Sequence, residues 1–392
     1  MSSLYSWSQF ALRTAGAAVG VAVKPGKLIF VVTKRCHSKC VYCDIWKVKD
    51  TPGGLDGELS LDEIRRVASA NSWLQWIDFT GGEPTDHPDF TEVVRSFSEA
   101  CPDLLLVHFP TNGIATKRIA EVVGAVKGFL KARLVVTVSI DGPPEMNDRL
   151  RGIRNDFVHA VDSFAAVRRI LGPENTYVGM TLHAHSGSCG MRTAEVMERT
   201  YAAVDEALAE RGEAPLGRSA FHLNIPHISQ HYYGNTDSKA SDGFGGPAHR
   251  AEVAEALTLA ARKSDGKGSL GMGVVERVYR SEAMRYLATG HTGIACSALL
   301  QTAYLSEKGQ LYPCTIWDKP LGSVRDTGYA FMPLIQKAWR EGVRKAVAEA
   351  KCPNCWTPCE AYPAILASPM KSVASLLRRP IQQQAGLNRP EP

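Results

Sequence analysis

Short runs of β-branched and apolar residues alternate with amphipathic segments across residues 28–224. Strands that alternate with helices pair in parallel through right-handed crossovers, which restricts the chain to a small set of α/β folds. We expect strands at residues 28–33, 76–80, 104–109, 134–140, 177–183 and 221–224, and helices at residues 61–70, 90–100, 115–130, 157–171 and 193–211. Six such units predict an open or partial barrel.

Two of these helices begin with residue pairs typical of a capping box. Ser60 stands three residues before Glu63, and Asp89 stands three residues before Glu92. In a capping box each side chain bonds the backbone N–H of the other residue, which fixes the start of the helix. We therefore expect helices to begin directly after Ser60 and Asp89.

Residues that can bind a ligand or react follow each expected strand. In parallel α/β folds such residues gather at the carboxyl ends of the strands, where they form one site. The segments that follow the six strands in turn are Cys36 to Cys43, 81–84, 111–113, 141–142, and two groups of histidines, His183 with His185 and His227 with His231.

The first of these segments carries three thiols. Cys36, Cys40 and Cys43 are separated by three and then two residues, with Tyr42 directly before the last thiol. Three thiolates can hold three irons of a 4Fe–4S cube and leave the fourth iron open to a ligand. The alternative is zinc, which usually takes four ligands in paired Cys-x-x-Cys spacing. The spacing here favours the cluster.

This spacing, followed by Gly-Gly-Glu-Pro at residues 81–84, resembles the radical S-adenosylmethionine (SAM) superfamily. The resemblance covers about residues 28–224 and implies a partial (β/α)6 TIM-like barrel. It implies a 4Fe–4S cluster on Cys36, Cys40 and Cys43 and reductive cleavage of SAM to a 5′-deoxyadenosyl radical. The SAM contacts that it implies are Tyr42, Gly81, Gly82, Glu83, Asn112, Ser139, Asp141 and Arg151.

Some of these residue types suit the part of SAM that they would meet. Gly81 and Gly82 lack a Cβ, so the backbone can approach the methionine amino group closely. Asp141, at the end of the fourth strand, suits the ribose hydroxyls, and Arg151 suits the methionine carboxylate as a fork of donors. Ordinary turn residues are the alternative reading for each.

A second group of cysteines lies near the end of the sequence. Cys296, Gly309 and Cys314 resemble the opening motif of twitch and SPASM domains, with a hairpin expected at residues 304–312 and a helix at 334–350. This resemblance implies a small C-terminal α+β iron-sulfur domain with one auxiliary 4Fe–4S cluster. Its expected ligands are Cys296, Cys314, Cys352 and Cys355, with Cys359 as an alternate. Structural zinc is the runner-up.

Residues 226–235, after the sixth strand, are dense in histidine and tyrosine. Polar loops at strand ends often build substrate pockets. An imidazole titrates near neutral pH, so His227 and His231 are the candidate bases for the proton that an oxidation releases.

Composition restricts the class of protein and its partners. The formal net charge is +5, spread along the chain, so no nucleic-acid partner is expected. Eight of the ten cysteines fall in the two groups, which favours metal binding in a reducing cytoplasm over disulfides. The apolar segment in residues 1–27 is too short to span a bilayer, and we expect it to pack against its own domain. Contact of this segment or of the basic C-terminal tail with a membrane surface is the alternative.

We therefore expect four regions after the N-terminal segment: a core barrel at 28–235, a linker with helices at 236–290, a twitch/SPASM-like domain at 291–362 and a tail at 363–392. The expected function is two-electron oxidation of a small molecule by a radical SAM oxidoreductase, with electrons from a donor such as flavodoxin or ferredoxin. Alternatives are a peptide maturase, an RNA-modifying enzyme and a zinc-stabilised binding protein.

Overall fold

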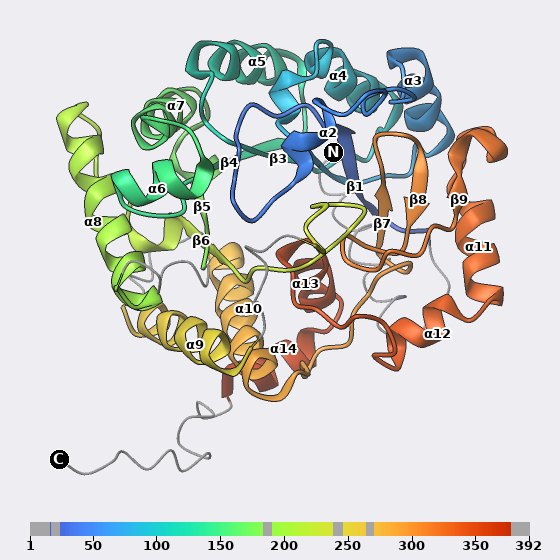
Figure 1. Ribbon diagram of the computed structural model, residues 1–392. Helices are drawn as coiled ribbons and strands as arrows, with labels where there is room; N and C mark the ends of the chain where they lie inside the picture. The colour runs from blue at the N-terminus through green and yellow to red at the C-terminus, as the bar shows by residue number, and fades with distance from the viewer. Residues whose placement is uncertain (1–15, 17–23, 183–189, 238–245, 264–269, 378–392) are drawn as a thin grey trace.

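Nine strands form one curved sheet in the order β6-β5-β4-β3-β2-β1-β7-β8-β9 (Figure 1). The computed structural model describes residues 16, 24–182, 190–237, 246–263 and 270–377. The first six strands pair in parallel in chain order, and β6 and β9 lie at opposite ends of the sheet, so the barrel is partial and unclosed, as expected. The strands are β1 (Lys27–Thr33), β2 (Trp76–Gly81), β3 (Leu106–Thr111), β4 (Arg133–Ser139), β5 (Thr176–Thr181), β6 (Phe221–Asn224), β7 (Thr302–Leu305), β8 (Gln310–Tyr312) and β9 (Gly322–Ser323).

Helices cover the outer face of the sheet and its open side (Figure 1). Those of the barrel units are α2 (Ile45–Val48), α3 (Leu61–Ala70), α4 (Phe90–Ala100), α5 (Thr116–Phe129), α6 (Pro144–Arg151), α7 (Asp156–Leu171) and α8 (Thr193–Glu210). Those that follow are α9 (Pro247–Arg262), α10 (Leu270–Thr289), α11 (Met332–Arg340), α12 (Val343–Ala348), α13 (Pro358–Leu366) and α14 (Pro369–Leu377).

The expected barrel elements are present, with ends shifted by at most two residues where the structure describes them. The largest shift is at β3, which begins at Leu106 because the Leu104 N–H closes a turn onto the Cys101 carbonyl at 3.1 Å. The fifth strand was expected to reach residue 183, but β5 ends at Thr181 and Leu182 lies outside it. Residues 183–189, with His183 and His185, lie outside the described residues.

One expected capping box is confirmed and the other is wrong. The Ser60 side chain accepts from the Glu63 N–H, and the Glu63 carboxylate accepts from the Ser60 N–H at 3.0 Å. Asp89 makes no side-chain cap, because its backbone (φ −103°, ψ 25°) is not extended and its own N–H donates to His87 Nδ1 at 3.1 Å.

The single helix expected at residues 334–350 is also wrong. Gly342 adopts a left-handed backbone (φ 78°), which ends α11 and starts α12 in a new direction. The Gly342 N–H bonds the Trp339 carbonyl at 3.1 Å, a short turn of the kind that terminates helices.

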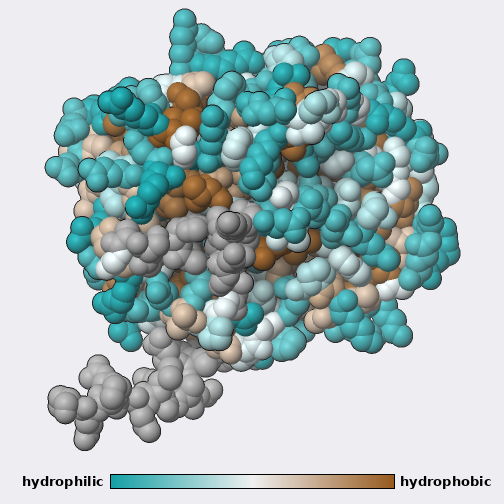
Figure 2. Space-filling model, viewed as in Figure 1, coloured by the Kyte–Doolittle hydropathy of each residue, from teal (hydrophilic) through white to brown (hydrophobic). Residues whose placement is uncertain are grey.

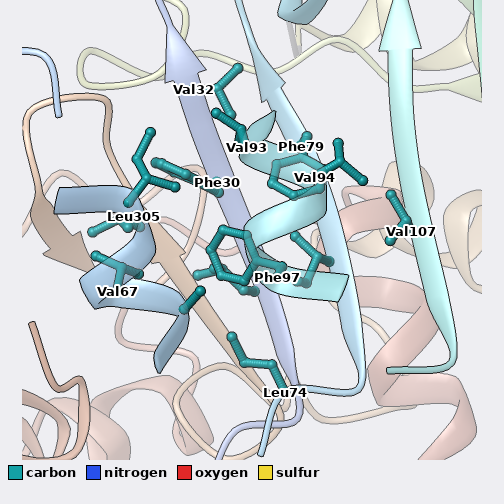
Figure 3. Close-up of a cluster of buried hydrophobic side chains, with 14 of the residues drawn as sticks. Phe30, Val32, Val67, Leu74, Phe79, Val93, Val94, Phe97, Val107 and Leu305 are labelled. Carbon is teal, nitrogen blue, oxygen red and sulfur yellow. The ribbon is translucent and has the colours of Figure 1, made fainter. Parts of the chain in front are cut away.

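The two faces of the sheet differ in polarity. Alternate residues of β1, β2 and β3, such as Phe30, Phe79 and Val107, point outward into an apolar core with α3 and α4 (Figure 3). Within it the rings of Phe79 and Phe90 meet edge to face at 5.6 Å between centroids. The inner face of the same strands carries Lys27, Asp78 and His108 and borders a cavity.

The C-terminal hairpin extends the barrel sheet. Strand β7 pairs in parallel with β1, and β7 pairs with β8 through Tyr304 with Tyr312 and Leu305 with Leu311, as the hairpin expectation required. Helices α10 and α13 lie on the open side between β6 and β7 (Figure 1). The expected domain boundaries at residues 235, 290 and 362 stay predictions.

No helix in the described ranges combines the length and the apolarity needed to cross a membrane. The face of the molecule in Figure 2 is mainly hydrophilic, with small hydrophobic patches between polar side chains. Most of the apolar segment in residues 1–27 and the tail beyond residue 377 lie outside the described residues, so their expected surface contacts stay predictions.

The buried side chain of Asn71 joins α3 to the C-terminal segment. Its amide donates to the Tyr329 carbonyl at 2.8 Å and accepts from the Phe331 N–H at 3.0 Å. We expect Asn71→Leu to lower the free energy of unfolding by about 3 kcal/mol, because both backbone groups lose their partner. Urea unfolding measures this. Asp62→Ala, on the exposed face of α3, is the control and should change stability by less than about 0.5 kcal/mol; equal effects would contradict the role of Asn71.

Candidate active site

A cavity of about 620 Å³ occupies the inside of the partial barrel. This volume lies within the usual range for pockets that hold small molecules and cofactors. The inner faces of β1 to β6 form its wall, and Cys359 and Tyr362 of α13 close part of the open side. Cys36, Cys40 and Cys43 line the cavity together, so the structure brings the first three predicted metal ligands to one place.

The loop that carries these thiols is held on two sides by backbone hydrogen bonds. On one side, Lys39 and Val41 donate to the carbonyls of Arg151 and Leu150 at the end of α6, each at 2.9 Å. On the other side, the Asp44 N–H donates to the Tyr233 carbonyl at 2.9 Å. The thiols are therefore positioned by segments that lie about 110 and 190 residues further along the chain.

Gly81 and Gly82 pack against the backbone of the cysteine loop, in addition to the SAM contact expected from sequence. A Cβ on Gly81 would lie 2.2 Å from the Thr33 carbonyl oxygen, and one on Gly82 would lie 2.0 Å from that of Arg35. The Gly82 N–H donates to Thr33 at 2.9 Å and the Glu83 N–H to Arg35 at 2.7 Å. The glycines are required because this turn packs directly against the start of the cysteine loop; both also line the cavity, and their contact with SAM stays a prediction.

Glu83 forms a buried brace between two strand ends. One carboxylate oxygen accepts from the Asn112 N–H at 2.6 Å, and the other accepts from the Thr85 hydroxyl at 2.6 Å. Burial raises the pKa of Glu83 although both bonds act against it. The Asn112 amide lies 4.0 Å from Cys36 Sγ and lines the cavity, whereas Glu83, an expected SAM contact, is not among the cavity-lining residues.

Tyr42, Asp141 and Arg151 meet in a buried network beside the thiols. The Tyr42 hydroxyl donates to Asp141 Oδ2 at 2.5 Å, and Arg151 bonds the same oxygen at 2.9 Å. Arg151 Nε also faces Asp156 Oδ2 at 3.3 Å. Burial raises the pKa of Asp156 to about 6, against the pull of Arg151. Tyr42, Asp141, Arg151 and Ser139 all line the cavity, and their contacts with SAM stay predictions. The Arg151 guanidinium already lies against two carboxylates, those of Asp141 and Asp156.

The thiols suit a metal cluster in their chemistry. Burial is the main reason that the pKa of Cys36 rises to about 12, and burial also raises those of Cys40 and Cys43. Iron binds the thiolate form, so a cluster held here would release the protons of these thiols as it binds. In the described residues no three His, Cys, Asp or Glu side chains converge on one metal-ion position. The ligands of a 4Fe–4S cluster attach to separate irons, so they need not converge on one position.

The C-terminal cysteines fall into two places. Cys296, Cys314 and Cys355 pack in one small cluster with Val347, and Cys352 is near enough to Cys296 to raise its pKa. Cys359 instead lines the barrel cavity, and burial raises its pKa to about 12. The four expected auxiliary ligands are thus near one another, with Cys359 apart from them.

The two histidines predicted as bases have different surroundings. His227 lines the cavity, but its Nδ1 faces the Ile225 carbonyl at 2.7 Å, and burial lowers its pKa to about 4. His231 is not among the cavity-lining residues. Its ring stacks on Tyr312 at 4.2 Å, and Nε2 donates to the Cys314 carbonyl at 3.0 Å. The expectation that His231 is a base in the substrate pocket is therefore corrected: it joins the loop to the C-terminal cysteines.

Sequence reasoning missed several cavity residues on the inner faces of the strands, among them Lys27, Asp78, His108 and Thr137. Polar residues at alternate positions of otherwise apolar strands were the available signal, because side chains two residues apart share a face.

The close approach of Gly82 to the Arg35 carbonyl predicts that a side chain at position 82 disturbs the cysteine loop. We expect Gly82→Ala to displace the cysteine loop, because its Cβ would overlap the Arg35 carbonyl. Iron bound per chain after anaerobic reconstitution should fall severalfold. The control is Gly128→Ala on α5, where a Cβ meets no atom within 4 Å. It should bind iron as the parent does and gain about 0.5–1 kcal/mol of stability. Parent-like iron binding by Gly82→Ala would contradict the packing role.

Comparison with known proteins agrees with this site. Residues 30–186 match the family model described as the radical SAM superfamily. The GTP 3′,8-cyclase of Klebsiella pneumoniae (strain 342) is 38% identical over 96 residues, which are 23% of this chain and 28% of that protein. The GTP 3′,8-cyclase of Vibrio cholerae serotype O1 (strain ATCC 39541 / Classical Ogawa 395 / O395) is 32% identical over 124 residues, which are 31% of this chain and 35% of that protein. The chain thus spans about a third or less of these relatives.

Solved structures are similar in fold. Streptococcus suis SuiB bound to the precursor peptide SuiA has a TM-score of 0.50 at 14% identity, covering 85% of this chain and 71% of that one. BtrN in complex with AdoMet and 2-DOIA has a TM-score of 0.41 at 11% identity, covering 84% and 90%. The three cavity-lining thiols lie within the segment that matches the family model. This chain therefore carries a domain of the radical SAM superfamily, over residues 30–186.

Proposed function

We propose that the protein is a radical SAM oxidoreductase that removes two electrons from a hydroxylated small molecule. The observation that carries the proposal is that Cys36, Cys40 and Cys43 border the same cavity as the polar inner face of the barrel. A cluster on these thiols would therefore sit at one end of a space that extends down the strands. A substrate in that space would be shielded from water.

With a 4Fe–4S cluster and SAM bound, reductive cleavage supplies a 5′-deoxyadenosyl radical. The chain's own residues hold and orient the reactants. Cys36, Cys40 and Cys43 would hold the cluster, and Ser139 and Asp141 lie where they can meet the ribose. Arg151 holds the Asp141 carboxylate in place through its 2.9 Å bond. Helix α13 covers part of the open side of the barrel and so limits the access of water to the cavity.

The C-terminal cysteines would hold an auxiliary cluster that takes up the second electron. Support comes from the small cluster of Cys296, Cys314 and Cys355 and from the proximity of Cys352. Residues 226–235 join this group to the barrel, since Ser229 Oγ donates to the Thr315 carbonyl at 2.7 Å and Asn235 donates to the Tyr42 carbonyl at 3.0 Å. An electron donor such as flavodoxin or ferredoxin in a reducing cytoplasm would supply the first electron.

Peptide maturation is the second candidate, favoured by the fold similarity to SuiB in its complex with a precursor peptide. Nucleotide chemistry is the third, suggested by the partial match to GTP 3′,8-cyclases. A cavity walled by strands and by α13 favours a small substrate over a peptide chain. A panel of myo-inositol and amino-substituted cyclic polyols, GTP and short synthetic peptides separates the three. The class that accelerates 5′-deoxyadenosine formation identifies the substrate type, and acceleration by peptides alone would overturn our choice.

Removing the first three thiols should abolish the chemistry. We expect the variant with Cys36, Cys40 and Cys43 all replaced by Ala to fold but to lose about four irons per chain and all 5′-deoxyadenosine formation with dithionite. Cys101→Ala is the control, because Cys101 is buried in the apolar core away from the cavity. Persistent SAM cleavage in the triple variant would show that another site holds the cluster.

The C-terminal cysteines allow a sharper comparison. We expect Cys314→Ala to reduce iron from about eight to about four per chain and to abolish substrate oxidation, while 5′-deoxyadenosine still forms. Cys359→Ala should keep all the iron, because Cys359 lies in the cavity, apart from the cluster of Cys296, Cys314 and Cys355. Iron, sulfide and zinc analysis measures both. About four irons with one zinc in the parent protein would rule out the auxiliary cluster.

A further inference from the structure

Three neighbouring strands place a threonine, a histidine and an aspartate in one line on the inner face of the barrel. Asp78 of β2 is the register partner of His108 of β3. His108 Nδ1 lies 3.3 Å from Asp78 Oδ1, and His108 Nε2 lies 3.0 Å from Thr137 Oγ1 on β4. All three residues line the cavity. This connectivity, hydroxyl to imidazole to carboxylate, is one that can move a proton.

The carboxylate is held in its charged form. Burial alone would raise the pKa of Asp78, but the Lys27 ammonium at 2.7 Å and the His108 ring outweigh burial and hold this pKa well below its usual range. Trp76 Nε1 also donates to Asp78 Oδ1, at 2.6 Å. A charged Asp78 draws the ring proton of His108 to Nδ1, because an acceptor faces that nitrogen. Nε2 is then left unprotonated and turned toward the Thr137 hydroxyl.

The fold does not explain why His108 and Thr137 are polar. Among the residues that the structure describes, the His108 ring contacts Asp78 and Thr137, and neither the His108 nor the Thr137 side chain bonds a backbone group. By contrast, the cavity histidine His227 bonds the Ile225 carbonyl, and His222 stacks on Tyr177 at 4.3 Å. The His108 side chain is 27% exposed and Thr137 is buried, and both lie against the cavity. Polar groups placed in this way on a pocket wall are candidates for contact with a ligand.

Thr137 also lies at a depth in the barrel that suits a substrate placed below SAM. Thr137 precedes Ser139 by two residues on the same face of β4, so the two side chains are separated by about 7 Å along the strand. If Ser139 and Asp141 meet the SAM ribose, a substrate one layer deeper would present a hydroxyl to Thr137 and a neighbouring C–H to the adenosyl carbon.

We propose that His108, positioned by Asp78, accepts through the Thr137 hydroxyl the proton that a substrate alcohol releases on oxidation. This inference rests on the proposed function. The 5′-deoxyadenosyl radical takes the hydrogen atom from the carbon that bears the hydroxyl. The O–H proton passes to Thr137 Oγ1, whose own proton goes to His108 Nε2. The remaining electron goes to an oxidised 4Fe–4S cluster on the C-terminal cysteines, and the C–O bond becomes a carbonyl. The substrate class is a small secondary alcohol.

The first test needs neither cluster nor substrate. Long-range ¹⁵N–¹H NMR of the histidine-labelled, metal-free full chain reports which ring nitrogen carries the proton, and comparison with His108→Asn assigns the signal. We expect His108 to be protonated on Nδ1 and unprotonated on Nε2 at pH 7.5. A proton fixed on Nε2 would overturn the proposal, since that nitrogen could then accept nothing from Thr137.

The second test separates proton transfer from radical formation. With the polyol that accelerates SAM cleavage, the ratio of oxidised product to 5′-deoxyadenosine should fall about 10²-fold or more in His108→Asn and Thr137→Val. Thr137→Ser restores the hydroxyl and should recover most of the ratio, which a packing role for the threonine would not predict. His159→Asn, on the exposed face of α7, is the matched control.

The outcomes distinguish a failure of the proton relay from a failure of the proposed radical SAM function. An unchanged ratio in His108→Asn would overturn the relay and leave the radical SAM function standing. Absence of SAM cleavage in the reconstituted parent protein would overturn the proposed function, while the NMR result would still decide whether Nε2 is free to accept a proton.

Discussion

The backbone contact between the cysteine loop and the turn after β2 is the constraint on which the rest of the site depends. Two consecutive N–H groups, those of Gly82 and Glu83, bond the carbonyls of Thr33 and Arg35. Only residues without a Cβ allow this approach. The Glu83 carboxylate then bonds the Asn112 N–H, so the ends of β1, β2 and β3 are fixed to one another. Because β1 also pairs with β7, the hairpin beside the C-terminal cysteines has the same support.

Much of the fold could be predicted because its signals are local. Alternating apolar runs marked the strands, and the Ser60 capping box marked the start of α3, since each depends on residues within one element. The failures occurred where a local signal competed with a neighbour. The Asp89 N–H was taken by His87, and Gly342 left the helical region of backbone space, which broke a segment whose apolar pattern looked continuous.

In the candidate site, too, the features within one loop could be predicted, whereas contacts between distant segments could not. Three cysteines within eight residues are visible in one loop, and their common cavity could be anticipated from their place after a strand. The surroundings of Arg151 could not, because its partners Asp141 and Asp156 meet it only once α6 and α7 have packed. His231 was misjudged for a related reason. Its ring partner, Tyr312, belongs to a hairpin some 80 residues away that folds back onto the barrel sheet.

The buried charges of the barrel interior connect stability to function. Lys27 and Asp78 are 2% and 7% exposed, and Arg151 and Asp141 are 5% and 3% exposed. Such pairs seldom stabilise a protein more than apolar residues of the same size, yet breaking one costs about 3–5 kcal/mol. The core on the outer face shows that these strands can pack with purely apolar side chains. Charge is therefore retained on the inner face, where the cavity lies, at a cost in stability that a bound polar ligand would account for.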